Sequence, residues 1–401
     1  MRLGKRRTSR GFAFVVLLAF MTVGALYLFV SQLDAAAIQR RRDEVTTRAL
    51  TEAKSALIGE AVAKPQIAEL GRLPLPDIGQ SFGKQTEGYA AGDFTASHKD
   101  YSVVGKLPWH SLGTAPLRDG IGECLWYMVS GRFKGTPPTA ALNWDTPGQI
   151  DIVDSAGNSI ASNLVALVVA PGAALDGQSR ALNNAAYKQC GGNYDARNYL
   201  DAYDAADAIA AEVNYFTGSI NNRVAGSTSN KRFVVANTSH YNDRVIAIAS
   251  DEIFRIIGRR GDFAAAIANW LDNSTFSQHL RDVAIAGRKG TDNVDCKQAA
   301  ASDQAFCKNW KEMLLLTDLP GPSTITLDGA SLPNCSRIVI FGGQRVAGQA
   351  RTTETDKSNP ANYLEGSNNS AFRTPTASDA NFTIWSQFDA NVPSRDVGRC
   401  L

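Results

Sequence analysis

The first 64 residues of this 401-residue chain contain no proline, and residues 12–33 contain no charged side chain. Proline breaks a helix interior, so its absence leaves nothing to interrupt a long N-terminal helix. An uncharged apolar run of about 20 residues is long enough to span a bilayer. The sequence therefore predicts a transmembrane helix over 12–33 that continues as a helical stalk over 34–63.

The chain also lacks the spacings typical of several kinds of catalytic or ligand site. There is no H-E-x-x-H pair for zinc, and the four histidines are dispersed. Residues 342–348 are glycine-containing, but they lack the spacing that positions backbone amides on nucleotide phosphates, so we interpret them as a turn after a strand. The formal net charge is only +2, so the sequence gives no nucleic-acid footprint.

All six cysteines lie beyond residue 63, which indicates disulfides in an exported domain: Cys124, Cys190, Cys296, Cys307, Cys335 and Cys400. Six cysteines allow fifteen connectivities, and the sequence does not choose among them. Cys296 and Cys307 would close a short loop, and Cys335 and Cys400 would tie down the C-terminus, which leaves Cys124 for Cys190. Zinc is the competing interpretation, but no C-x-x-C pair favours it.

Three aspartates, Asp292, Asp295 and Asp303, surround Cys296 in a polar stretch that could wrap a cation. Calcium, which takes roughly six to eight oxygen ligands, is the ion that we consider, although no EF-hand spacing is present. We expect no cofactor and name these aspartates as candidate cation ligands.

A basic leader over 1–11 precedes the apolar run, and the order of basic residues, Gly11, Phe12 and apolar helix resembles a type IV prepilin or type II secretion pseudopilin. In that family a prepilin peptidase cuts after the glycine, and the new N-terminal residue, commonly Phe, is methylated. The resemblance therefore implies that Gly11 and Phe12 are processing residues. The family's usual glutamate, five residues into the mature chain, falls here at Val16, and some minor pseudopilins at filament tips also lack it.

The resemblance continues between residues 53 and 254, where several segments follow the order found in a bacterial family of large pilin-like proteins. These segments are 53–59 (AKSALIG), 71–77 (GRLPLPD), 105–113 (GKLPWHSLG), 119–122 followed by a strand at 125–129, and 242–254. Relatives often carry a cysteine where this chain has Leu75. The family supplies no catalytic motif, so the resemblance implies a protein that is not an enzyme.

We expect an α+β fold in which a long N-terminal transmembrane and stalk helix packs on an antiparallel β-sheet, with a mostly helical insertion and a disulfide-linked C-terminal part. Ile38, Val45, Ala49, Ala53 and Leu57 share one arc of the helix and should meet the sheet. The expected divisions are a leader (1–11), a transmembrane helix (12–33), a periplasmic stalk half (34–63), a pilin-like β domain (64–194), a helical insertion (195–290) and a C-terminal β/loop region (291–401).

Local patterns predict further elements within these divisions. Residues 149–153 and 162–169 read as two strands around a turn, and 352–373 as a long polar loop. An alanine-rich helix is predicted over 199–216, with Asp201 on its solvated acidic face together with Asp204 and Asp207.

The resulting hypothesis is a non-enzymatic, pilin-like minor subunit of a type IV pilus or a type II secretion pseudopilus, assembled through its N-terminal helix. Its expected partners are other pilin-like subunits, prepilin peptidase and the lipid bilayer, without nucleic acid. Its expected location is the bacterial inner membrane, single-pass, with the N-terminus cytoplasmic and the C-terminal domain periplasmic. The alternative is a membrane-tethered periplasmic enzyme or binding protein with a signal anchor.

Overall fold

The computed structural model describes residues 10–81, 84–85, 87–92, 102–135, 141–181, 187–191, 193–201, 231–236, 241–373 and 382–401; for some of these, including 10–13 and 27–34, it describes the backbone alone.

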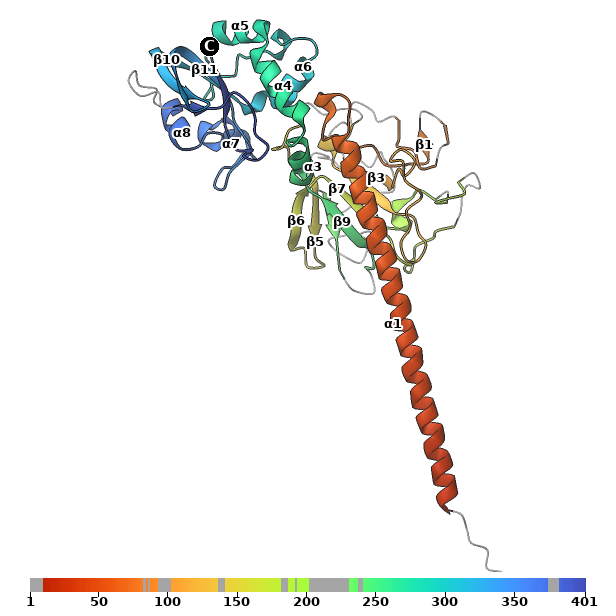
Figure 1. The fold of residues 1–401 in the computed structure, drawn as a ribbon. Coiled ribbons are helices and arrows are strands. Elements are labelled where there is room, and N and C mark those ends of the chain that lie inside the picture. The colour runs from red at the N-terminus through yellow and green to blue at the C-terminus, as the bar shows by residue number, and fades with distance from the viewer. Residues whose placement is uncertain are drawn as a thin grey trace, which may run out of the picture.

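The N-terminal helix α1 (Arg10–Val62) is continuous over 53 residues, as expected where no proline interrupts it. Its C-terminal third packs on a sheet through small and apolar side chains, among which Ala53 and Leu57 are fully buried. Figure 1 shows the N-terminal part of α1 extending far beyond the sheets. The predicted arc is buried from Ala49 onward, whereas Ile38 and Val45 remain exposed. Arg244 of β9 still reaches α1 at Asp43 and Thr47, so Val45 is exposed although the sheet lies nearby.

The sheet beneath α1 has four antiparallel strands in the order β3-β4-β7-β9. Its strands are β3 (Val103–Lys106), β4 (Trp126–Val129), β7 (Ala166–Ala170) and β9 (Arg244–Ile248). Strands β7 and β9 lie closest to α1. The opposite face of this sheet packs on a three-stranded sheet of order β6-β5-β8, through apolar side chains such as Trp126, Leu167 and Phe233. That second sheet consists of β5 (Ile150–Val153), β6 (Ser159–Leu164) and β8 (Lys231–Val234).

The strand predicted over 162–169 is in fact two strands that belong to different sheets. β6 pairs with β5 and ends at Leu164, and β7 begins at Ala166 in the sheet under α1. Asn163 sits at the break with φ 57°, a left-handed conformation that interrupts an extended strand. The prediction that this apolar run is extended is therefore confirmed, but the sequence did not predict that the run divides between two sheets.

A third sheet, of order β12-β10-β11-β13, forms the centre of the C-terminal lobe. It consists of β10 (Leu314–Leu327), β11 (Ala330–Phe341), β12 (Thr383–Ile384) and β13 (Val397–Cys400), and a small separate hairpin is made by β1 (Gln80–Ser81) and β2 (Lys84–Gln85). The helices of this lobe and its junction are α3 (Ser250–Ile257), α4 (Gly261–Asp272), α5 (Ser274–Asp282), α6 (Gln304–Trp310), α7 (Glu354–Ser358) and α8 (Gly366–Arg373). Since α7 and α8 fall within 352–373, the prediction of a long polar loop there is wrong.

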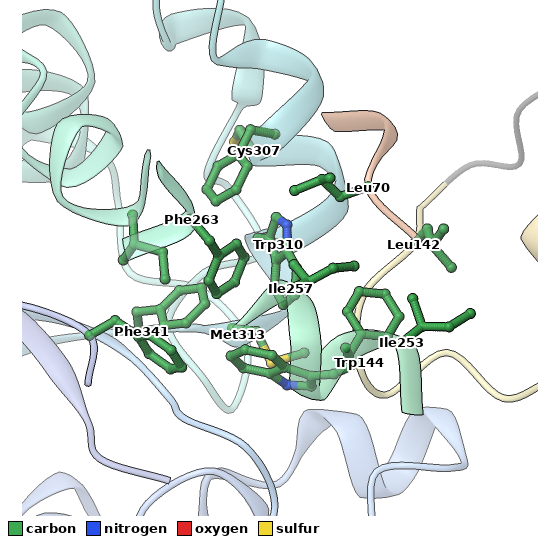
Figure 2. Packing of buried hydrophobic residues seen from close by; sticks show 14 of the residues in the cluster. Leu70, Leu142, Trp144, Ile253, Ile257, Phe263, Cys307, Trp310, Met313 and Phe341 are labelled. Carbon is green, nitrogen blue, oxygen red and sulfur yellow. The ribbon is translucent and has the colours of Figure 1, made fainter. Parts of the chain in front are cut away.

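A cluster of aromatic side chains joins this lobe to the α1 region. The ring centroid of Trp310 lies 4.6 Å from that of Trp144 and 5.0 Å from that of Phe263. Figure 2 shows these side chains with Ile257 and Leu70 nearby. One buried apolar cluster includes all five residues and runs from Leu57 of α1 to Val397 of β13. The two lobes in Figure 1 therefore share a single core.

The structure contains three disulfides: Cys124–Cys190, Cys296–Cys307 and Cys335–Cys400, with Cα–Cα distances of 5.5, 5.6 and 5.5 Å. They confirm the prediction of disulfide bonds. The third disulfide links β11 to β13 and so holds the C-terminus on the sheet, because the two strands are hydrogen-bonded neighbours.

The transmembrane part of the predicted fold is wrong. Crossing a bilayer requires about 20 consecutive apolar residues in a helix, and over the residues that could be searched in the described structure no helix has a long enough apolar stretch. This finding overturns the predicted transmembrane and stalk helix over 12–33 and 34–63. It also overturns the single-pass inner-membrane location, which depended on that helix. The coarser description, an α+β chain, stands.

Candidate binding cavity

A cavity of about 730 Å³ lies at the junction of the lobes. That volume falls in the usual range of about 300–1,000 Å³ for small-molecule sites. Four separate stretches of the chain contribute to its wall, and their lining residues are Trp144, Asp145, Asp251, Phe254, Arg255, Gly258, Arg259, Gln344, Arg345, Val346, Ala347, Gly348, Gln349, Ala390, Asn391 and Pro393. The segment 342–348, which the sequence identified as a turn after a strand, therefore forms one side of the cavity.

Helix α3 supplies the basic side of the cavity. It is amphipathic: Ile253, Phe254 and Ile257 are buried against the shared core. Arg255 lies in its last turn, and Arg259 follows one turn later, where the chain still turns helically through Gly258. Residues four apart on a helix lie on the same face. The burial of the apolar face thus leaves both guanidinium groups exposed at the cavity.

An ion-pair network fixes the opposite wall. The Asp145 carboxylate contacts two arginines, with Oδ2 3.0 Å from Arg351 Nη1 and Oδ1 3.0 Å from Arg345 Nε. The side chains of Asp145 and Arg351 are 2 % and 0 % exposed, whereas that of Arg345 is 46 % exposed. Burial raises the pKa of Asp145, and the two guanidinium groups oppose that rise. Arg345 is therefore held at one end by a buried charge and open to solvent at the other.

Arg351 connects the loops that carry this wall. Its Nη1 donates to the Gly343 carbonyl oxygen at 2.9 Å, its Nη2 donates to Gln349 Oε1 at 3.2 Å, and its Nε donates to the Asn362 carbonyl oxygen. Its guanidinium also lies over the Tyr363 ring, 4.2 Å from the centroid. One buried side chain thus ties four points of the chain together, so the position of the wall is set before any ligand binds.

The described residues that line the cavity include no serine, cysteine, histidine or lysine. Its acidic groups are Asp145, which is engaged by two arginines, and the exposed Asp251. A nucleophile activated by a neighbouring base is therefore missing from this wall. The arginines give this cavity groups that can bind an anion.

The residues named from the sequence lie elsewhere. Gly11 and Phe12 fall in the first turn of α1, where only the backbone is described. All six cysteines are consumed in disulfides. The cavity residues Asp145, Arg255, Arg259 and Arg345 were missed, because no short motif links them. The one local signal was the spacing of Arg255 and Arg259 by one helical turn.

The three candidate cation ligands have separate surroundings. Asp292 lines a second cavity of about 410 Å³ beside Lys289, Lys308 and Lys311. The Asp295 carboxylate accepts a hydrogen bond from the Lys297 backbone N–H at 3.0 Å and caps a turn. Asp303 Oδ1 accepts a hydrogen bond from Ser302 Oγ at 2.9 Å. Within the described ranges no group of three or more acidic, histidine or cysteine side chains is placed to hold a metal ion. The calcium site at Asp292, Asp295 and Asp303 therefore gains no support and remains only a prediction from the sequence.

Asp201 is buried, contrary to the solvated acidic face predicted for it; Asp204, Asp207 and most of the predicted helix over 199–216 lie outside the described residues. Asp201 and Asp243 accept each other's backbone N–H, at 2.9 Å in both directions. Burial raises the pKa of Asp201, and burial together with Asp201 raises that of Asp243. This carboxyl pair joins the chain at 201 to the start of β9.

The spacing G-x-S-x-G occurs once within the chain, at residues 79–83, and was overlooked in the sequence. A serine nucleophile elbow requires a strand followed by a tight turn and a helix. Here Ser81 belongs to β1, which is followed by the antiparallel strand β2. The described backbone therefore forms a hairpin at this position and not an elbow.

No protein-family model, no curated protein and no solved structure matches this chain.

Proposed function

We propose that the protein is a non-enzymatic, pilin-like minor subunit that assembles with other pilin-like subunits, in a type IV pilus or a type II secretion pseudopilus, through α1. One observation supports this proposal most strongly. The N-terminal part of α1 exposes a dense set of large apolar side chains, namely Phe14, Val15, Val16, Leu17, Leu18, Phe20, Met21, Val23 and Leu26. A helix that is apolar all round is normally buried.

Among the described residues nothing covers this part of α1, and the helix there extends beyond the sheets. Other helices of the same kind would cover it, and the apolar surface would leave water on assembly. The choice of the pilin-like family rests on the resemblance of the sequence segments between residues 53 and 254.

Processing at Gly11 is the direct test. The full chain is produced with an active prepilin peptidase or with an inactive one, and the mass of its N-terminal peptide is measured. We expect a chain that begins at methylated Phe12 only with the active peptidase. Gly11→Val should abolish the cleavage, whereas the matched leader variant Gly4→Val should leave it unchanged. A chain that keeps residues 2–11 with both peptidases would refute the proposal.

A further inference from the structure

The lining of the cavity at the lobe junction has more positively charged than negatively charged side chains. Three arginines line it, Arg255, Arg259 and Arg345, together with two aspartates. The charge of Asp145 is already matched by the fully buried Arg351, which lies behind the wall. The three arginines are therefore opposed by Asp251 alone, and the cavity has an excess of guanidinium groups.

Two of these guanidinium groups are available to a ligand. Arg255 and Arg259 are exposed, and neither has an ion pair or a side-chain hydrogen bond with any described residue. Asp251 lies one turn before Arg255 on α3, yet the two side chains form no ion pair. A guanidinium presents five N–H donors in a planar fork that matches the oxygens of carboxylates and phosphates.

The remainder of the wall suits a ligand with an apolar part. Trp144, Val346, Ala347 and Pro393 line the cavity beside the arginines. The Trp144 Nε1–H is buried and has no hydrogen-bond acceptor among the described residues.

We propose that this cavity binds a small molecule that carries a carboxylate or phosphate group, with Arg255, Arg259 and Arg345 contacting its oxyanion. Arg345 is pre-positioned because Asp145 holds its Nε, and the loop around it is fixed by the bonds from Arg351 to Gly343 and Gln349. A pre-organised site loses less conformational freedom on binding. This proposal concerns the C-terminal lobe junction and does not depend on assembly through α1.

Isothermal titration calorimetry of the full-length chain with citrate and with pyrophosphate, at about physiological ionic strength, tests the proposal. We expect saturable binding of at least one of these anions at a single site. The double variant Arg255→Gln/Arg259→Gln should weaken that binding by at least about tenfold, because each lost charged hydrogen bond is worth that much or more. The control is Arg48→Gln, which removes one guanidinium charge from an exposed position on α1.

Tighter binding of citrate would identify a carboxylate ligand, and tighter binding of pyrophosphate a phosphate ligand; either result supports the site. The proposal is overturned if the wild-type chain binds neither anion, if the double variant binds as the wild type does, or if Arg48→Gln weakens binding equally. Should the double variant fail to fold by circular dichroism, the single variant Arg259→Gln, at an exposed position beyond α3, is held to the same criterion.

Discussion

Asp396 is a buried carboxylic acid whose environment favours the protonated form. It is 3 % exposed, and its Oδ2 accepts a hydrogen bond from Asn368 Nδ2 at 2.7 Å, while its Oδ1 has no partner among the described residues. Burial raises its pKa to about 8, although the bond from Asn368 opposes the rise. Ionising a carboxyl group in such a site is unfavourable because the charge loses its hydration.

The raised pKa predicts how stability depends on pH. The folded state holds the proton of Asp396 more tightly than the unfolded state, whose pKa is near 3.8. The stability contributed by this proton is complete below pH about 4 and is lost as the pH rises through about 8. Asp396→Asn cannot ionise, so its stability relative to wild type should rise between pH 5 and pH 9.

Urea unfolding midpoints of the two proteins at those two pH values measure this difference. Asp77, whose pKa burial raises to about 6, is present in both proteins, so its contribution cancels in the comparison. Parallel pH profiles for the wild type and Asp396→Asn would contradict the prediction.

At the scale of elements, the loop over 119–122 explains one of the pilin-like segments. Asp119 Oδ1 accepts the backbone N–H groups of Ile121, Gly122 and Glu123, and its Oδ2 accepts that of Gly172. The loop so formed lies directly against α1: the Gly120 backbone N–H donates to Thr46 Oγ1 at 2.9 Å. Asp119 and Gly122 thus shape a loop that positions α1 on its sheet.

Gly120 allows this close approach, because a Cβ atom there would lie 2.3 Å from the Arg42 carbonyl oxygen. Gly120→Ala should therefore lower the free energy of unfolding by about 1–3 kcal/mol, as overpacking usually does. Chemical denaturation of the variant measures the loss.

The matched control is Gly59→Ala on the exposed side of α1, where an added Cβ meets nothing within 4 Å. Alanine has the higher helix propensity, so this variant should gain about 0.5–1 kcal/mol. Equal effects of the two substitutions would show that Gly120 does not set the distance between α1 and the loop.

At the scale of the whole molecule, the shared aromatic cluster makes the two lobes one cooperative unit. Trp310 is 3 % exposed and contacts Trp144, Phe263 and Phe341 through ring faces and edges. These rings come from distant parts of the sequence, so their packing couples the segment before β5 to α4 and β11. Loss of this packing should weaken both lobes together.

Trp310→Ala should lower the free energy of unfolding by about 3–5 kcal/mol. Hydrogen exchange should show β4 and β10 losing protection in the same transition, since both strands border one core. The control Trp385→Ala removes a half-buried ring that stacks on Arg395 outside the cluster, and its effect should be smaller. Separate transitions for β4 and β10 in the wild type would contradict a single core.

The sequence by itself determined the features that depend on neighbouring residues. The absence of proline before residue 65 leaves Arg10–Val62 free to form one helix, and the spacing of Ala49, Ala53 and Leu57 identified the face that packs. The even number of cysteines predicted disulfides, although the sequence did not choose among the possible pairings.

Only the tertiary structure decided the rest, because it depends on contacts between residues far apart in the chain. The left-handed conformation of Asn163 divides one apolar run between two sheets. Helices α7 and α8 form in a polar stretch, and the chain between them is held by the buried Tyr363 ring, which packs against the Arg351 guanidinium. The cavity brings Asp145, Arg255 and Arg345 together across some 200 residues of sequence, and no local periodicity encodes such a meeting.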